Sequence, residues 1–424
     1  MTAPTKAICL LASLVLITSF AARAEAVLSL DEAIRLATHN QPLLQSYDQA
    51  SLASREAAVA DSQLPDPRLK FGVVNLPITG SDAVRFNRDD MTMSTIGVMQ
   101  EMVPAAKREA ALHTGEARVA EYQSEKSVTA RSIQRDVALA WLDVYEAQRK
   151  SELYQQISQD MTAERKVMLS RISSGAISSA EVLKLDTELS MSNDKKLTAV
   201  LAERKARAAL SRWIGAAAQL PIANELPVFS ISSSPESSTR EIELHPLLQN
   251  AEQMQALAQS EADQAKAEHE LNWSWELIYG RRRADLSDMV SLQVALDLPW
   301  DRANRQDKRA AEKLILVEKA RQLTEDRRRE LRAELESAEA DADTAKAREA
   351  EHQQRLIPAA EARLSLAQAG YEAGKENLSE VWDARRALIA VEIEHWVIMT
   401  DMQRAAVRLD YLLNNTNLYS WSQP

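Results

Sequence analysis

Two carboxylates near the C-terminal end of the chain have a spacing that suits ion binding. Glu380 and Asp383 are three residues apart, so on a helix they lie on one face. Neighbouring carboxylates raise each other's pKa and attract cations strongly. The alternative interpretation is a solvated acidic face, in which Glu380 or Asp383 pairs with Arg385 or Arg386.

The remaining polar residues do not form a pattern typical of catalysis or of a bound metal. Six histidines are scattered along the sequence, and none has a second ligand three or four residues further on, as a helical zinc site requires. The sequence also lacks a P-loop, a Gly-rich dinucleotide fingerprint and a nucleophile elbow. We therefore expect no enzyme activity, no cofactor and no resident metal.

Four methionines cluster around the second strand of the first predicted hairpin: Met91, Met93, Met99 and Met102. Thioethers suit Cu(I) or Ag(I). The alternative is that these side chains face lipid or fill gaps in packing.

The composition favours long helices. Aromatic residues make up only 5% of the 424 residues, and there are only nine glycines. With 51 Lys and Arg against 62 Asp and Glu, the net charge is −11, which argues against nucleic-acid binding.

The first 24 residues read as an export signal. Lys6 gives a positive start, residues 8–20 are apolar, and Ala22 and Ala24 form a small-x-small cleavage site. The mature chain is expected to begin at Glu25, without Cys9, the single cysteine. The alternative is a membrane anchor, but the apolar run falls short of the roughly 20 residues that a spanning helix needs.

Long helices are predicted over residues 104–172 and 300–369, each followed by a glycine-containing break and a second helix, 178–213 and 377–413. At 1.5 Å per residue, the long helices would each extend roughly 100 Å. Helices of this length require a coiled coil or a tube. Apolar residues recur along them at helical spacing, as in Val137, Trp141, Val144 and Tyr145.

Two hairpins interrupt the helical pattern, at about 67–103 and 271–299. In the second hairpin Trp273, Trp275, Leu277 and Tyr279 alternate with polar residues, and residues 290–298 alternate in the same way. An apolar face opposite a polar face is typical of transmembrane β-strands, although a soluble amphipathic hairpin shares the pattern. No segment after the signal could cross a membrane as a helix, so a membrane domain would have to be a β-barrel.

The chain repeats itself. Residues 41–45 recur as residues 245–249, Pro104 and Pro299 each close a hairpin, and the breaks at Gly175 and Gly374 correspond. We therefore predict two tandem repeats, 25–235 and 236–424, joined by a Ser- and Pro-rich linker at 230–239.

This organisation resembles the TolC family of outer-membrane efflux proteins over essentially all of the mature chain. The specific motifs are residues 29–33, the hairpin-closing prolines and the glycine-to-acidic-valine break in each half. Residues 64–69 and the first hairpin resemble the heavy-metal (CzcC/CusC-like) resistance-nodulation-division efflux branch. Unlike lipid-anchored members, the chain has no acylatable cysteine near the mature start.

The resemblance implies a mainly α fold with a membrane β-barrel. Each protomer would contribute long helices to an α-helical barrel and four β-strands to the membrane domain. A homotrimer would close a twelve-stranded β-barrel in the cell outer membrane. The chain would be a passive exit duct for heavy-metal cations, working with a periplasmic adaptor (membrane fusion) protein and an inner-membrane resistance-nodulation-division pump.

The resemblance also assigns roles to residues at the periplasmic tips. Glu380 and Asp383 would line the closed periplasmic gate, while the first repeat has Glu181 and Lys184 at these places. The tips that meet the adaptor would be Ser174, Gly175, Ala176, Ile177, Ala373, Gly374, Lys375 and Glu376.

Other functions are weighed against this one. The duct could carry drugs or other small solutes. A periplasmic coiled-coil scaffold would share the helices but would not need two strand pairs with apolar faces. An adaptor protein would carry compact β-domains and a single helical hairpin.

Overall fold

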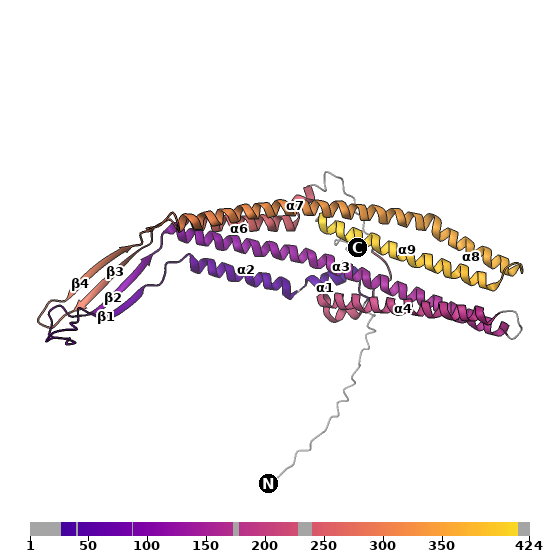
Figure 1. Ribbon diagram of the computed structural model, residues 1–424, viewed down its shortest axis with the longest axis horizontal. Helices are drawn as coiled ribbons and strands as arrows, with labels where there is room; N and C mark the ends of the chain where they lie inside the picture. The colour runs from indigo at the N-terminus through magenta and orange to yellow at the C-terminus, as the bar shows by residue number, and fades with distance from the viewer. Residues whose placement is uncertain (1–26, 40, 87, 173–177, 228–239, 414–424) are drawn as a thin grey trace, which may run out of the picture.

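The computed structural model describes residues 27–39, 41–86, 88–172, 178–227 and 240–413. The chain is a long rod with a small sheet at one end and helices along the rest of its length (Figure 1). Three parts of the sequence prediction lie outside the described residues: the signal peptide 1–24, the linker 230–239, and the first tip with Ser174, Gly175, Ala176 and Ile177.

The two halves of the chain contain corresponding elements. The first half consists of α1 (Leu30–Thr38), α2 (Pro42–Asp61), β1 (Arg68–Val74), β2 (Met93–Met102), α3 (Ala105–Ile172), α4 (Ser179–Ile214) and the short 3-10 helix η1 (Gly215–Gln219). The second half consists of α6 (Pro246–Ala267), β3 (Trp273–Arg281), β4 (Met289–Leu296), α7 (Gln306–Glu351), the π-helical turn η2 (His352–Leu356), α8 (Ile357–Glu372) and α9 (Leu378–Leu413).

Capping residues explain where several helices begin. Ser29 accepts a hydrogen bond from the Glu32 amide at 3.2 Å and so caps α1. Pro42 and Pro246 open α2 and α6, where a missing N–H costs nothing. The equivalence of these two prolines in the repeats therefore has a structural reason.

The second long helix differs from the prediction, which placed one helix over 300–369. Helix α7 begins only at Gln306, because the preceding residues form turns in which the Asn304 side chain bonds to the Asp301 carboxylate at 3.0 and 3.2 Å. The helix is then interrupted by η2. Pro358 has no N–H to donate to the carbonyl four residues earlier, and the wider π turn directly before it accommodates that loss.

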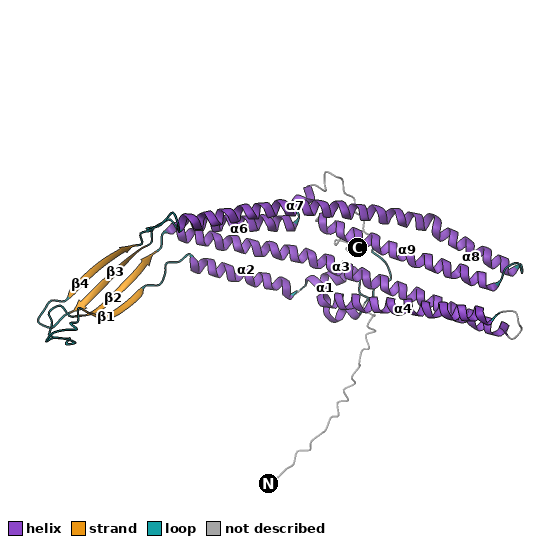
Figure 2. Cartoon of the chain, viewed as in Figure 1, coloured by secondary structure: helices purple, strands orange, loops and turns teal. Residues whose placement is uncertain are grey.

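The four strands form one antiparallel sheet in the order β1-β2-β3-β4 (Figure 2). Its register places the apolar side chains opposite one another, with Trp273 facing Leu296 and Leu277 facing Leu292. The predicted alternation is therefore confirmed: one face is apolar across the sheet. On the other face Lys70 and Glu276 form an ion pair at 2.7 Å.

The main core lies halfway along the rod, where α1, α3, α4 and η1 meet. Trp141 is fully buried there and donates its indole N–H to the carbonyl of Leu28 at 3.1 Å. The apolar residues predicted at helical spacing, Val137, Trp141, Val144 and Tyr145, are all buried. Within the described part of the chain, every helix is too short or too polar to cross a membrane.

Candidate functional site at the helical tips

The two predicted gate residues lie at the start of α9, close to the ends of α3 and α4. A cavity of about 330 Å³ separates these three helices. Its charged lining residues are Glu164, Arg171, Glu181, Lys184, Glu188, Glu380, Asp383 and Arg386. Glu380 and Asp383 therefore line one cavity, as expected from their spacing on one helix face. Charged residues of α3 and α4, which belong to the first repeat, line the same cavity.

The second tip is a tight reversal between α8 and α9. Gly374 has a φ of +68°, a left-handed conformation that glycine adopts without strain. Ala373 donates its amide to the carbonyl of Ala369 at 3.0 Å, and Lys375 donates to Gly370 at 2.9 Å. These bonds satisfy the last carbonyls of α8 and direct residues 373–376 to the end of the rod (Figure 1).

Asp383 pairs with Arg386, one of the two partners named in the alternative interpretation. Arg386 also contacts Glu164 of α3 at 2.6 Å and Glu188 of α4 at 3.6 Å. Arg385 pairs instead with Asp160 of α3 at 2.5 Å. Asp383 therefore has a cationic partner within one chain, which it shares with Glu164 and Glu188.

Glu380 is in a different situation, because it is exposed and forms no ion pair with any described residue. Its counterpart in the first repeat, Glu181, accepts a hydrogen bond from the Ser178 amide at 3.1 Å in a capping box. The two halves thus use equivalent glutamates differently. Glu181 caps the start of α4, whereas the carboxylate of Glu380 lines the cavity without a cationic partner among the described residues.

The sequence prediction missed Glu164, which supplies the most buried charge at this site. Its side chain is only 4% exposed. Burial raises the pKa of Glu164, and the contact with Arg386 only partly offsets this effect. A signal was present in the sequence: Ile157, Met161 and Glu164 follow one another at helical spacing, which places a carboxylate on the buried stripe of α3.

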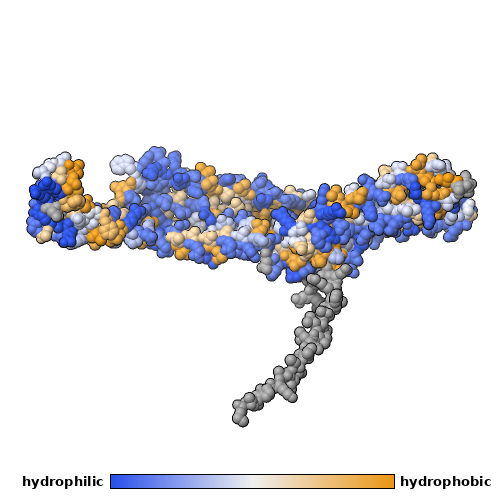
Figure 3. All heavy atoms as spheres, turned by 90° about the horizontal axis from the view of Figure 1, so that it is seen from below, coloured by the Kyte–Doolittle hydropathy of each residue, from blue (hydrophilic) through white to orange (hydrophobic). Residues whose placement is uncertain are grey.

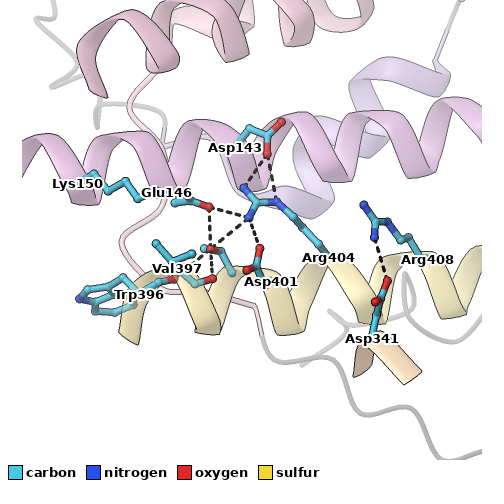
Figure 4. Close-up of polar contacts among 10 residues, drawn as sticks. Asp143, Glu146, Lys150, Asp341, Trp396, Val397, Asp401, Arg404 and Arg408 are labelled. Carbon is cyan, nitrogen blue, oxygen red and sulfur yellow. Dashed lines mark hydrogen bonds and ion pairs between the residues drawn. The ribbon is translucent and has the colours of Figure 1, made fainter. Parts of the chain in front are cut away.

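A second polar cluster joins α3 and α9 nearer the middle of the rod (Figure 4). Arg404 contacts Glu146 at 2.6 Å, Asp143 at 2.7 Å and Asp401 at 2.8 Å. Burial works against ionised Glu146, but its contacts with Lys150 and Arg404 prevail and lower its pKa. Arginines of α9 therefore pair with carboxylates of α3 at both the middle and the tip of the rod.

The four methionines do not meet at one site. Met93 and Met99 lie on the polar face of β2, Met102 lies on its apolar face, and Met91 precedes the strand. Six residues of strand separate Met93 from Met99 by roughly 20 Å. Among the described residues, there is also no group of three or more His, Cys, Asp or Glu placed to hold a metal.

Comparison with known proteins supports the relationship that the sequence suggested. Residues 239–415 match the model of the family "Outer membrane efflux protein". A sequence comparison with curated proteins finds no match.

Solved structures share the fold over most of the chain. A membrane protein from Pseudomonas aeruginosa matches with a TM-score of 0.76 and 17% identity, covering 91% of this chain and 93% of its own. The transmembrane channel CusC matches with a TM-score of 0.73 and 15% identity, covering 91% of each chain. The outer membrane protein VceC from Vibrio cholerae matches with a TM-score of 0.72 and 15% identity, covering 91% of this chain and 95% of its own.

The second repeat thus matches the outer membrane efflux protein family, and the whole described chain has the fold of outer-membrane channels. The resemblance drawn from the sequence is confirmed at this level. The matched family and the similar structures are channels, which supports the expectation that the chain is not an enzyme.

Proposed function

We propose that this protein is the passive outer-membrane exit duct of a tripartite efflux system. The observation that carries the proposal is the sheet, whose apolar side chains are exposed on one face at the end of a long helical rod. Phe71, Val290 and Leu292 are between 69% and 72% exposed. Strands of seven to ten residues extend roughly 23–34 Å, a range that includes the height of about 25 Å of the apolar band of an outer-membrane barrel.

The proposed duct is a homotrimer. In one chain β1 and β4 are edge strands whose backbone groups on the outer side are unpaired, which is costly in a membrane. Four strands are also too few to enclose a lumen. Three copies would pair each β4 with the β1 of a neighbour, giving twelve strands and leaving no edge. The helical rods would then form a tube across the periplasm.

The proposed partners are a periplasmic adaptor protein and an inner-membrane resistance-nodulation-division pump. The adaptor would contact the tips, Ala373, Gly374, Lys375 and Glu376 in the second repeat and Ser174, Gly175, Ala176 and Ile177 in the first. Exposed apolar residues lie near this end of the helices, among them Leu169, Leu183 and Leu366, and apolar surface is visible there in Figure 3. Such surface on a rod end favours a protein partner.

The proposed cargo is heavy-metal cations, and the support for it is the resemblance of residues 64–69 and the first hairpin to the heavy-metal branch. Drugs or other small solutes are the second candidate. Metal tolerance of a deletion strain, measured beside its drug tolerance, separates the two.

Glu380 and Asp383 are proposed to form the periplasmic gate. In a trimer, six carboxylates would surround one constriction and attract cations. Because Asp383 is paired with Arg386, Glu380 would supply most of the uncompensated charge.

Two adjacent residues of β4 provide the test of the membrane proposal. Leu292 lies on the apolar face and Ser291 on the polar face. Leu292→Arg should greatly reduce the amount of trimer in the outer-membrane fraction, because an arginine facing lipid near the midplane costs about 2–4 kcal/mol. Ser291→Arg should assemble normally. Equal assembly of the two variants, or a monomer in the soluble fraction for the unaltered protein, would refute the proposal.

A further inference from the structure

We propose that Arg281 binds the phosphate group of a lipid headgroup in the outer leaflet of the outer membrane. The inference rests on the proposed function, because it takes the apolar face of the sheet to contact lipid and the helical rod to lie in the periplasm. In that orientation the loops that join β1 to β2 and β3 to β4, at the end of the sheet away from the helices, lie at the outer surface of the membrane (Figure 2). Arg281 is the last residue of β3 before the second of these loops.

The register of the sheet places Arg281 on the apolar face. Side chains of a strand alternate between two faces, so Arg281 shares its face with every second residue of β3 from Trp273 to Tyr279. Across the sheet Arg281 is opposite Ser94 of β2, which is in turn opposite Val73 of β1, an exposed apolar residue. Arg281 therefore continues the apolar side of β3 by one position.

The place of Arg281 along the strand corresponds to the margin of a membrane. Eight residue steps separate Arg281 from Trp273 at the other end of β3, which is roughly 26 Å along the strand. The apolar band of an outer-membrane barrel is about 25 Å tall and is flanked by aromatic residues at both interfaces. An arginine that faces lipid is costly near the midplane but not near the interface, where its long side chain reaches the headgroups. The sheet therefore carries Arg281 at the level of the outer headgroups.

The guanidinium of Arg281 is available to a ligand. Arg281 is exposed and forms no hydrogen bond or ion pair with any described residue. The two arginines that follow it are engaged: Arg282 donates from Nε to the carbonyl of Asp90 at 3.0 Å, and Arg283 pairs with Asp285 at 2.5 Å and with Asp90 at 3.0 Å. Of the three consecutive arginines, Arg281 alone thus keeps all five N–H donors free of partners within the described part of the chain.

The carboxylate of Asp288 lies near Arg281 but does not pair with it. Its Oδ2 accepts a hydrogen bond from the hydroxyl of Tyr279, and its Oδ1 accepts one from the backbone amide of Arg282 at 3.1 Å. The charges of Asp288 and Arg281 still influence one another. Asp288 therefore weakens the attraction of an anion to Arg281 without occupying its donors.

A phosphorylated lipid fits this arrangement better than a free anion does. A planar guanidinium presents paired N–H groups that match two oxygens of a phosphate. The next row of the apolar face, which includes Tyr279 and Val290, would contact the acyl chains while the phosphate lies at Arg281 and at the exposed hydroxyl of Ser94. Inorganic phosphate has no part that could use the apolar row. The site therefore favours a lipid headgroup.

Titration of purified trimers with lipid A, followed by native mass spectrometry, tests the inference. Lipid A combines phosphate groups with several acyl chains. Arg281→Gln should weaken its binding about fivefold, the effect of one basic residue at an anionic membrane surface. Arg281→Lys keeps the charge but not the paired donors, so its affinity should be intermediate. Asp288→Asn should bind lipid A more tightly, because a repelling charge is gone while an amide oxygen can still accept from Tyr279.

Arg282→Gln is the matched control. It removes the same charge at the adjacent position, but its guanidinium is already bonded to the carbonyl of Asp90. Its affinity for lipid A should equal that of the unaltered protein. Lipid A from which the phosphates have been removed should bind the unaltered protein and Arg281→Gln equally well. Added inorganic phosphate should not displace lipid A from the unaltered protein.

Two results would overturn the inference. One is equal binding of lipid A by Arg281→Gln and the unaltered protein, and the other is displacement of lipid A by inorganic phosphate, which would indicate a simple anion site. Both leave the proposed duct intact when the trimers come from the outer-membrane fraction. Unaltered protein that never forms trimers in that fraction refutes the duct and, with it, the lipid site.

Discussion

Gly115 of α3 lies directly against Ala58 of α2. A β-carbon added to Gly115 would be 2.2 Å from the β-carbon and 3.0 Å from the α-carbon of Ala58. Real side chains do not approach so closely, so the two helices pack at this point only because residue 115 has no side chain. The contact lies in the half of the rod nearest the sheet, beside a cavity of about 350 Å³ between helices.

Gly115→Ala should therefore destabilise the protein even though alanine is the better helix former. Overpacking typically costs about 1–3 kcal/mol, which exceeds the gain of up to about 1 kcal/mol in helix propensity. The melting temperature of the purified protein, followed by circular dichroism, should fall. The double variant Gly115→Ala/Ala58→Gly moves the methyl group to the other helix and should recover much of the loss. A Gly115→Ala protein as stable as the original would contradict this account.

Arg404 and Arg408 lie one turn apart on α9 and provide a second test (Figure 4). The side chain of Arg404 is 18% exposed and contacts Glu146, whereas that of Arg408 is 51% exposed and, among the described residues, pairs with Asp341 alone, at 3.5 Å. Arg404→Gln leaves the mostly buried Glu146 with one cationic partner, Lys150, instead of two, and should cost up to about 3 kcal/mol. Arg408→Gln should cost less than about 1 kcal/mol, as for exposed pairs. The free energy of unfolding of both variants is measured by chemical denaturation. A similar decrease in the two variants would show that burial does not determine how much these ion pairs stabilise the protein.

His245 should make stability depend on pH. It is buried, accepts a hydrogen bond from the Leu247 amide at 3.1 Å and lies 2.9 Å from the carbonyl of Tyr411. Burial lowers its pKa from 6.5 to about 4. The unfolded chain therefore takes up a proton at a higher pH than the folded chain does. The stability contributed by neutral His245 is complete above about pH 6.5 and is lost as pH falls towards 4, by about 3 kcal/mol in all.

The variant His245→Asn keeps a residue that can cap α6 but does not titrate. The melting temperature of the unaltered protein should fall between pH 6.5 and 4, and this part of the fall should be much smaller in His245→Asn. Because other groups titrate in the same range, the difference between the two proteins is the quantity to compare. Parallel curves would show that His245 is not the group responsible.

Much of the fold could be predicted because its signals are local and repeated. The alternation of Trp273, Trp275 and Leu277 defines one face of a strand, and the length of α3 follows from a run without proline. The π turn at 352–356 has a local signal too, Pro358, but proline alone does not say whether a helix ends or bends. The contact between Gly115 and Ala58 could not be predicted, because it depends on how two helices far apart in sequence approach one another.

The candidate site was predictable only for residues within one helix. The spacing of Glu380 and Asp383 places them together whatever else the chain does. Among the described residues, Asp383 has a cationic partner and Glu380 does not, and this difference depends on Arg386. The position of Arg386 depends in turn on Glu164 and Glu188, which lie more than 190 residues away in sequence. Ion pairs between distant segments leave no periodic signal, so the sequence alone gave Asp383 and Glu380 equal weight.

The structure separates these two acids, and ion selectivity tests the separation. Glu380 is exposed and unpaired among the described residues, whereas Asp383 shares Arg386 with Glu164. Under the proposed gate, Glu380→Gln should remove most of the preference for cations, measured as the reversal potential in a salt gradient across a planar bilayer. Asp383→Asn should change the reversal potential less. The conservative variant Glu380→Asp keeps the charge and should keep the selectivity. If Asp383→Asn lowers the selectivity as much as Glu380→Gln does, the pair with Arg386 does not persist in the assembled duct. If neither variant alters selectivity in protein that still forms trimers, both residues are ordinary surface charges and the gate lies elsewhere.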